Sequence, residues 1–340
     1  MKRLKVRLGF TKSLNIAIGL FIVFSALLRL SSAWYWLDPV VRTFISFLIN
    51  TFVIGYGLLY FLDIKTNNFS CLVLFSYILS LFLDILLVAL IIFQPIYRTV
   101  RLLIQLVIGS LLTAKTVRRS KGNVNFLITF SIDEMLAMLV TFFILAFGIL
   151  QIVPKLATNV YMDSFNHLWQ SVILYRAPQA YEYYVYLTYH SLEVAIIDDI
   201  GVSIGGMPTM QLFLSFLNFI PIVALYQLSH SIFKRSHYKI ALSILLVFVF
   251  FSGFAWIYFM HQQLHHPDWQ VNYTLEFIKE KTYSLTGYGQ LFFITGHVPA
   301  ISAYAFLMLI ISLYFDEEHR ERDVLLILFL SSFLLIFLHL

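Results

Sequence analysis

Residues 70–94 read SCLVLFSYILSLFLDILLVALIIFQ, an apolar run in which Asp84 is the one charged residue. About 20 apolar residues in an α-helix cross the hydrocarbon core of a bilayer, so this run predicts a membrane-spanning helix. The whole chain has 340 residues, of which 60% are hydrophobic and 12% charged, whereas a soluble domain has roughly 25% charged residues. We therefore expect an integral membrane protein whose surface mostly faces lipid.

Comparable apolar windows recur along the chain. They predict an all-α fold, a polytopic transmembrane helix bundle of about nine spanning helices. The windows lie at residues 14–34, 41–62, 70–94, 98–114, 132–153, 209–232, 239–260, 289–314 and 323–340. Segment 183–204 is ambiguous, because it is partly apolar but carries His190, Glu193, Asp198 and Asp199.

The distribution of Lys and Arg resolves this ambiguity and orients the chain. Basic residues concentrate in the N-terminal tail, in the loop after window 98–114, and around 234–239 and 320–322. Cytoplasmic loops carry the excess of basic residues, and these loops share one side only if 183–204 does not cross. We therefore expect a multi-pass protein of the cell membrane with a cytoplasmic N-terminus. The net charge of +5 follows from these loops and gives no reason to expect a nucleic-acid partner.

This topology divides the chain into three parts. Residues 1–153 form an N-terminal block of five transmembrane helices, and residues 154–208 form an outer loop with juxtamembrane helices. Residues 209–340 form a C-terminal transmembrane block that contains a second outer loop, 261–288. Segment 183–204 is then a juxtamembrane or re-entrant helix on the outer face.

The first outer loop contains two groups of candidate site residues. Asp163 and His167 are spaced i, i+4, which places them on one face of a helix. The aspartate there can act as a base or metal ligand with help from the histidine, or it can simply cap the helix. His190, Glu193, Asp198 and Asp199 can bind a divalent ion or the hydroxyl groups of a sugar. The alternative is that they form the solvated face of an amphipathic surface helix.

The second outer loop and one spanning helix contain the remaining candidates. His261 and His265 are spaced i, i+4, as two ligands of one metal can be, and Asp268 is a candidate third ligand. His265 and His266 can instead contact a phosphate, and the alternative to both is a polar helix end at the membrane surface. Asp84 is different, because an ionisable residue deep in a spanning helix is a functional candidate by default.

Four segments together resemble the GT-C superfamily of polytopic membrane glycosyltransferases, in particular its archaeal and bacterial members. The segments are MDSFNHLWQSVILYRAP (162–178), YLTYHSLEVAII (186–197), SFLNFIPIVALYQLSHSIFKR (215–235) and FFSGFAWIYFM (250–260). The first is similar to the opening of that superfamily's large outer loop, which begins with an aspartate soon after a helix. The resemblance covers roughly half of the chain, from Asp163 to its end.

The resemblance implies inverting transfer of a hexosyl or pentosyl group from a polyprenyl-phosphate donor in the membrane lipid to an acceptor on the outer face. Asp163 would be the catalytic base or a metal ligand, with His167 beside it and Asp268 as a further metal ligand. Arg176, His265 and His266 would stabilise the leaving phosphate, and His190, Glu193, Asp198 and Asp199 would bind substrate. The cofactor would be a divalent cation such as Mg²⁺ or Mn²⁺.

Two alternatives from other classes remain open. A membrane transporter or lipid flippase would use Asp84 within the long hydrophobic block. A non-catalytic subunit of a glycan-assembly complex would instead bind a larger membrane-protein partner.

Overall fold

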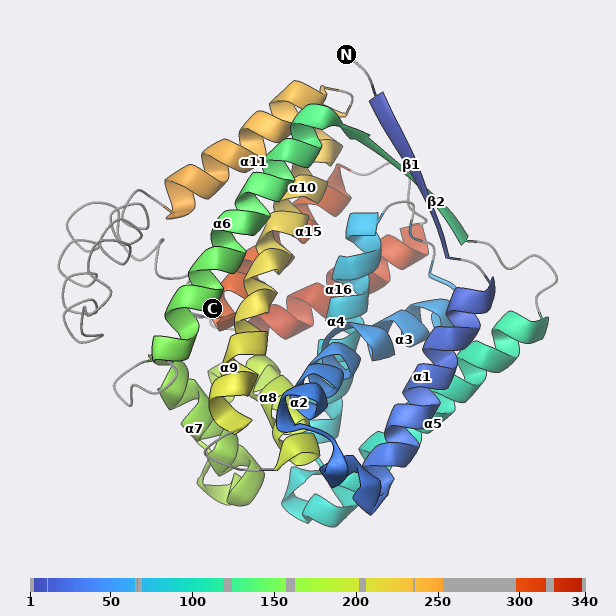
Figure 1. The fold of residues 1–340 in the computed structure, drawn as a ribbon, viewed down its shortest axis with the longest axis vertical. Helices are drawn as coiled ribbons and strands as arrows, with labels where there is room; N and C mark the ends of the chain where they lie inside the picture. Colours follow the sequence, from blue (N-terminus) through green and yellow to red (C-terminus); the bar gives the residue numbers. More distant parts are fainter. Residues whose placement is uncertain are drawn as a thin grey trace.

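The computed structural model describes residues 3–10, 12–64, 66, 69–118, 124–156, 163–201, 206–234, 236–252, 298–315 and 321–337. Helices account for most of these residues (Figure 1). The strands and α-helices are β1 (Arg3–Phe10), α1 (Lys12–Leu30), α2 (Pro39–Leu48), α3 (Ile54–Leu62), α4 (Phe69–Val88), α5 (Gln94–Arg118), β2 (Val124–Ser131), α6 (Ile132–Leu156), α7 (Asp163–Arg176), α8 (Leu187–Ile200), α9 (Gly206–Ser215), α10 (Ile220–Phe233), α11 (His237–Ser252), α15 (Val298–Tyr314) and α16 (Glu321–Ile336).

The helices support the prediction of a membrane protein, since five helical segments are candidate spans, but they do not confirm the predicted number of spans. Within the described ranges, five helical segments are long and apolar enough to cross a bilayer, and they lie at Lys12–Leu30, Pro39–Leu62, Phe69–Val88, Ile91–Arg118 and Thr209–Phe233. Each of the other predicted windows contains a helix or part of one. The figure of about nine spans therefore stays a prediction.

One small sheet is an exception to the predicted all-α fold. β1 and β2 pair as an antiparallel ribbon in which Arg3 lies opposite Ser131 and Phe10 opposite Val124. β2 reads VNFLITFS, and its β-branched and aromatic residues favour an extended strand. The ribbon joins the start of α1 to the end of α5, so both ends must lie on the same side of the molecule (Figure 1).

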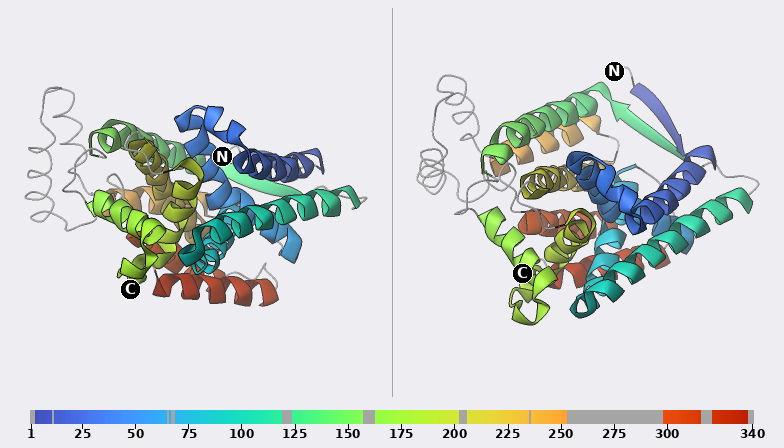
Figure 2. Two further views of the ribbon diagram at one scale, coloured as in Figure 1. Left: turned by 90° about the horizontal axis from the view of Figure 1, so that it is seen from below. Right: turned by 60° about the horizontal axis from the view of Figure 1, so that its bottom comes forward.

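Helices α1 and α5 lie side by side in every view (Figure 1 and Figure 2). Two glycines permit this close approach. A Cβ atom on Gly19 would lie 2.9 Å from the carbonyl oxygen of Gly109, and a Cβ on Gly109 would lie 2.8 Å from the carbonyl oxygen of Gly19. Small residues at such crossings allow membrane helices to pack backbone against backbone.

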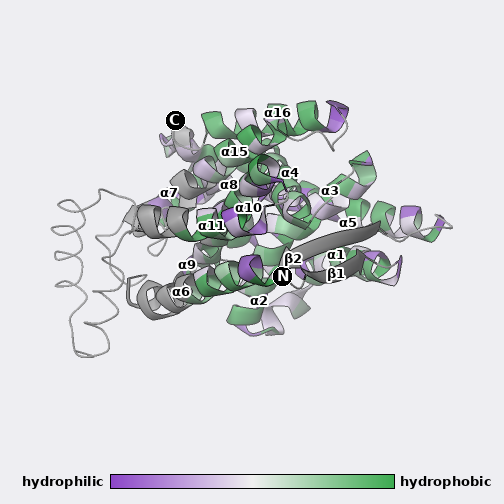
Figure 3. Ribbon diagram, turned by 90° about the horizontal axis from the view of Figure 1, so that it is seen from above, coloured by the Kyte–Doolittle hydropathy of each residue, from purple (hydrophilic) through white to green (hydrophobic). Residues whose placement is uncertain are grey.

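The main hydrophobic core surrounds α4, which packs against α3, α8, α10 and α16. Because this core contains residues from both the 1–153 and the 209–340 blocks, those blocks are divisions of the sequence around one continuous core. The outward faces remain apolar, as with Phe24, Ile92 and Leu103, which are 65%, 67% and 51% exposed. Figure 3 shows hydrophobic residues along most of α15 and α16 and hydrophilic ones at the ends of α5 and α16. Such faces are suited to lipid.

Basic side chains gather at one end of the bundle. Lys12 donates to the carbonyl oxygen of Val117 at 3.0 Å, and Lys115 donates to that of Tyr60 at 2.8 Å. Arg322 donates to the carbonyl oxygen of Leu62 at 3.2 Å. The carbonyls belong to the C-terminal turns of α5 and α3, where cations are favoured. Lys12, Lys115 and Arg322, three of the basic residues predicted to share the cytoplasmic side, therefore lie at one end of the bundle.

Candidate functional site: a buried helix with charged residues

Helix α8 lies inside the bundle although it contains His190, Glu193, Asp198 and Asp199. It has 14 residues, a length of about 21 Å at 1.5 Å per residue, which is too short for the roughly 30 Å hydrocarbon core. All residues from Thr188 to Asp199 are buried, and the helix packs against α2, α4 and α7. The alternative of a solvated amphipathic surface helix is therefore wrong. Length and burial favour a re-entrant helix.

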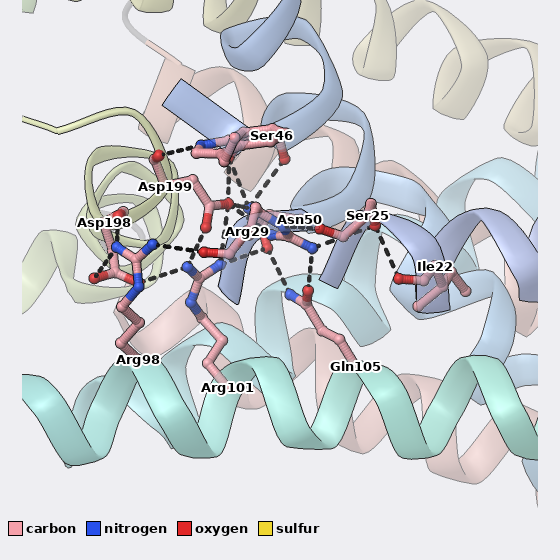
Figure 4. A network of polar contacts seen from close by, with 11 residues as sticks. Ile22, Ser25, Arg29, Ser46, Asn50, Arg98, Arg101, Gln105, Asp198 and Asp199 are labelled. Carbon is pink, nitrogen blue, oxygen red and sulfur yellow. Dashed lines mark hydrogen bonds and ion pairs between the residues drawn. The ribbon is translucent and has the colours of Figure 1, made fainter. Parts of the chain in front are cut away.

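The C-terminal end of α8 is held by two buried arginines from other helices (Figure 4). Arg29 of α1 lies 2.7 Å from Asp199, between Nη1 and Oδ2, and Arg101 of α5 lies 2.6 Å from Asp198, between Nη2 and Oδ2. Arg101 also pairs with Oδ1 of Asp199. The side chains of both arginines and of Asp199 are 0% exposed. Arg98 adds a longer ion pair, with Nη1 lying 3.8 Å from Oδ1 of Asp198, so three guanidinium groups surround the two carboxylates.

Amide and hydroxyl groups complete this network. Ser46 donates to Oδ2 of Asp199 at 2.6 Å, and Asn50 donates to the same oxygen at 3.2 Å. The side-chain oxygen of Asn50 accepts from Arg101 at 3.3 Å and from Gln105 at 3.1 Å. Gln105 in turn accepts a hydrogen bond from Arg29. A buried ion pair needs such additional partners, because the attraction alone seldom repays the loss of hydration.

The backbone of α8 is fixed at the same end. The indole Nε1 of Trp34 donates to the carbonyl oxygen of Asp199 at 2.6 Å, and Nη1 of Arg98 donates to that of Asp198 at 2.7 Å. Nη2 of Arg98 also donates to the carbonyl oxygen of Arg29 at 3.0 Å. The last carbonyls of a helix have no partner within it, and here side chains from two other segments supply the donors.

A π-helical turn at Ile49–Val53 interrupts the span formed by α2 and α3 next to this network. Ser46 lies one turn before it and Asn50 lies within it, and both side chains donate to Asp199. Single π-turns within α-helices are frequently found at functional sites. The turn is therefore a second irregular feature beside α8, and it lies in a helix that is long enough to span.

Charge pairing decides the protonation of Asp199. Burial by itself would raise its pKa, but the charges of Arg101 and Arg29 outweigh burial and hold the pKa well below the usual range for a carboxyl. Asp199 is therefore ionised throughout the physiological pH range.

A separate polar chain crosses the interface between α7 and α8. Nδ1 of His167 lies 3.0 Å from Nε2 of His190, and Nδ1 of His190 lies 2.6 Å from the hydroxyl of Tyr181. The Tyr181 hydroxyl donates to the carbonyl oxygen of Tyr183 at 2.5 Å. Burial and the nearby His167 lower the pKa of His190 to about 3. His190 is therefore a neutral ring at physiological pH.

Glu193 lies one turn beyond His190 and is fully buried. Its Oε2 accepts a hydrogen bond from the hydroxyl of Ser171 on α7, and within the described residues its Oε1 has no hydrogen-bond partner. Burial raises the pKa of Glu193 to about 8, although the hydrogen bonds from Ser171 and Tyr189 act in the opposite direction. At neutral pH the carboxyl is mostly protonated.

Asp84 lies where the sequence predicts, deep in α4 and 4% exposed. It interacts electrostatically with Arg101 and Asp199. Its Oδ2, the hydroxyl of Tyr97 and Nε of Arg101 are buried without a hydrogen-bond partner in the part of the chain that the structure describes. Three polar atoms from α4 and α5 therefore remain unsatisfied beside the charged network.

The structure groups some of the predicted site residues and separates others. His167, His190 and Glu193 meet at the α7–α8 interface, whereas Asp198 and Asp199 occupy the other end of α8. The carboxylate oxygens of Asp198 and Asp199 are already paired with arginines. A cation or a sugar would have to compete with these arginines, and the predicted role of the two aspartates in binding one stays a prediction.

The remaining predicted residues lie apart from these two groups. Arg176 ends α7 with an exposed side chain. Asp163 is the first residue of α7, but its side chain lies outside the described part, as do loop 261–288 with His265, His266 and Asp268. No group of three or more metal-ligating side chains converges among the described residues. The predicted divalent cation stays a prediction.

Sequence reasoning missed the arginines. Basic residues near the ends of spanning helices commonly extend toward the membrane surface, and Arg29, Arg98 and Arg101 all lie at or near the edges of apolar windows, so their positions in the sequence give no reason to place them in a site. Arg29 and Arg101 instead point inward to Asp198 and Asp199. One signal could have found them. Two adjacent acids in a partly apolar segment need basic partners if they are buried, and basic residues stand at the edges of two apolar windows elsewhere in the chain.

Comparisons with protein-family models, with curated proteins and with solved structures find no match to this chain. The similarity to GT-C glycosyltransferases is therefore a prediction from the four sequence segments alone.

Proposed function

We propose that this protein is a membrane transport protein that moves a small ion or polar solute through its helical bundle. The observation that carries the proposal is α8, a helix too short to span the bilayer that is buried from Thr188 to Asp199 and holds four charged or titratable side chains within the bundle, those of His190, Glu193, Asp198 and Asp199. Ionisable residues between membrane helices are costly and mark ion or substrate pathways. Interrupted helices at such sites are typical of transporters.

The buried carboxyls that form no ion pair within the described residues, Asp84 and Glu193, strengthen this proposal. A helix that served packing alone would need only apolar residues. The ion pairs of Asp198 and Asp199 have a structural explanation, because they hold α8 in place. Asp84 and Glu193 have no such explanation, since each is buried with one oxygen that has no partner among the described residues. Buried polar atoms of this kind indicate a site that exchanges a ligand, a water molecule or a proton.

The test is transport by purified protein in liposomes. Fluxes of H⁺, Na⁺ and K⁺ and the scrambling of a fluorescent lipid are measured against protein-free liposomes. We expect at least one flux severalfold above that of the protein-free liposomes and a large loss in Asp84→Asn, which removes the ionisable group without leaving an arginine unpaired. Asp38→Asn is the matched control, because Asp38 is an exposed N-cap and Asn caps equally well. Correctly folded protein with no flux of any of these species overturns the proposal.

The glycosyltransferase prediction has its own test. It requires Asp163 near the acceptor, since a general base must reach the proton that it removes. His167, its predicted partner, uses Nδ1 for the contact with His190. If Asp163→Asn, produced at normal levels, abolishes transfer of sugar from a polyprenyl-phosphate donor, the enzyme reading replaces the transport proposal. Co-purification of a larger membrane partner would favour the non-catalytic subunit.

A further inference from the structure

Three guanidinium groups and two carboxylates meet at the C-terminal end of α8 (Figure 4). Arg101 pairs with Asp198 and with Asp199. Arg29 adds a second pair with Asp199, and Arg98 lies 3.8 Å from Asp198. These five side chains carry three positive charges and two negative ones. An unbalanced charge in the interior of a membrane protein is costly, so the network favours one further negative charge beside it.

Three buried polar atoms next to this network have no hydrogen-bond partner within the described residues. They are Nε of Arg101, the hydroxyl oxygen of Tyr97 and Oδ2 of Asp84, in side chains that are 0%, 0% and 4% exposed. Tyr97 and Arg101 are spaced i, i+4 on α5 and share a face, and Cζ of Arg101 lies 5.8 Å from the centroid of the Tyr97 ring. Asp84 of α4 interacts electrostatically with both. The three side chains therefore form one group where α4 meets α5.

The hydrogen-bonding capacity of this group selects the charge of its ligand. Nε of Arg101 can only donate, the Tyr97 hydroxyl can donate, and Asp84 donates when its carboxyl is protonated. An anion accepts from all three groups and neutralises the excess positive charge, whereas the arginines repel a metal cation. A water molecule can satisfy the same atoms but leaves the charge unbalanced. One excess charge and complete burial therefore favour an anion that is small and monovalent.

We propose that Arg101, Tyr97 and Asp84 form a binding site for a small monovalent anion such as chloride or bromide, and that the anion binds together with a proton on Asp84. The network then has two balanced states, one with an ionised Asp84 and no anion, the other with a protonated Asp84 and one anion. Passing from the first to the second takes up one proton from solution, which forms an O–H bond on the carboxylate, and no bond of the protein breaks. In the transport function proposed above, on which this last step rests, the anion and the proton are the species that move together.

The charged and titratable groups that act on Asp84 come from two helices packed against α4. They are Arg101 and Tyr97 of α5 and Asp199 of α8. Other titratable side chains of α4 and of the helices around it have partners elsewhere: Tyr56 with Asn15, Tyr60 with Lys115, Tyr77 with Tyr189, His190 with Tyr181, Glu193 with Ser171, Tyr226 with Glu134, His230 with Tyr226, and Asp323 with Arg322. Asp84 is therefore the carboxyl whose charge responds to an anion at this site.

Thermal unfolding of the purified protein in detergent tests the anion site without a transport assay. Chloride or bromide replaces gluconate at constant ionic strength, and a ligand of the folded state raises the unfolding temperature. We expect both halides to raise it saturably, with an affinity that falls severalfold in Tyr97→Phe, which removes one donor and no charge. Tyr314→Phe is the control, because Tyr314 is 83% exposed, and it should bind halide as the unaltered protein does. Equal unfolding temperatures in halide and gluconate, the result for a bound water alone, overturn the site, as does an unchanged affinity in Tyr97→Phe.

The pH dependence of halide binding tests the proton on Asp84. Affinity should fall as the pH rises, by up to about tenfold per pH unit for one linked proton, because an ionised Asp84 itself neutralises the excess charge. Asp84→Asn keeps a neutral side chain that can donate, so its affinity for chloride should not change with pH. The same pH dependence in Asp84→Asn overturns the coupling. If halides bind as expected but liposomes show no flux, the anion site is supported and the transport function fails. Flux without any halide effect on stability supports transport and overturns the anion site.

Discussion

The carboxylate of Asp199 lies 2.7 Å from the guanidinium of Arg29, although the two residues are 170 positions apart in the chain. Asp199 is the next-to-last residue of a helix too short to span, and Arg29 is the next-to-last residue of a candidate span. The same carboxylate accepts from Ser46 and Asn50 of the neighbouring span and pairs with Arg101 of another. One side chain therefore joins three spans to α8. The position of α8 depends on charge pairing as much as on apolar packing.

The first prediction concerns this pairing. Asp199→Asn leaves Arg29 and Arg101 with excess positive charge in the interior and should destabilise the protein by about 3–5 kcal/mol. Arg29→Gln should cost less, because Asp199 keeps Arg101, Ser46 and Asn50 as partners. The double variant Arg29→Gln/Asp199→Asn restores the charge balance and should be more stable than Asp199→Asn alone. Thermal unfolding in detergent measures all three.

A surface arginine provides the control for that series. Arg322 pairs with Asp323, but its side chain is 67% exposed, and exposed pairs contribute about 0–1 kcal/mol. Arg322→Gln should therefore change the unfolding temperature little. Equal losses for Arg322→Gln and Asp199→Asn, or strictly additive losses in the double variant, would show that the Arg29–Asp199 pair does not hold α8.

The second prediction concerns the pH dependence of stability. The folded-state pKa of Glu193 is raised from 4.5 to about 8, so between these values the folded protein binds more protons than the unfolded chain. Stability from this group must therefore fall as the pH rises from 4.5 to about 8, by up to about 1.4 kcal/mol per pH unit. Glu193→Gln removes this dependence. Unfolding temperatures of both proteins across this range give the difference, and parallel curves would contradict a raised pKa.

Part of this arrangement follows from sequence and part does not. The apolar run around Asp84 predicts both a spanning helix and the burial of the carboxyl, and the basic loops correctly indicate that Lys12, Lys115 and Arg322 share one end. Those conclusions depend on local composition and on the cost of charge in lipid. The arginine partners of Asp199 lie far from it in the sequence. Composition does not identify them, because the lipid-facing and protein-facing sides of an apolar window look alike.

The same reasoning explains two further misses. The acidic pattern of 183–204 fits a surface helix or an interior one equally well, and only the matching arginines on other helices decide for the interior. The β1–β2 ribbon was missed because the N-terminal basic residues explain the topology without any defined structure.

The third prediction tests the contact of α1 with α5. Gly19→Ala would bring a Cβ atom to 2.9 Å from the carbonyl oxygen of Gly109, so the two backbones must separate. We expect a loss of about 1–3 kcal/mol, as in overpacked cores. Ala17→Val on the exposed side of α1 is the control and should be nearly neutral. Thermal unfolding of both variants provides the comparison, and a neutral Gly19→Ala would show that the helices are farther apart than the structure places them.

The last prediction uses the register of the β1–β2 ribbon to test the arrangement of the ends. Arg7 lies opposite Leu127 in the ribbon, whereas Phe130 lies opposite Leu4. In a Cys71→Ser background, which removes the one native cysteine, the pair Arg7→Cys with Leu127→Cys should form a disulfide under mild oxidation. Arg7→Cys with Phe130→Cys should form it much more slowly, because residues three positions out of register lie about 10 Å farther along the strand. Gel mobility after proteolysis between the cysteines measures both.

A disulfide requires the N-terminal tail and the segment after α5 to lie on the same side of the membrane, so efficient cross-linking of the first pair alone supports the register and the shared side. Equal failure of both pairs would contradict the ribbon and with it the joined ends of α1 and α5.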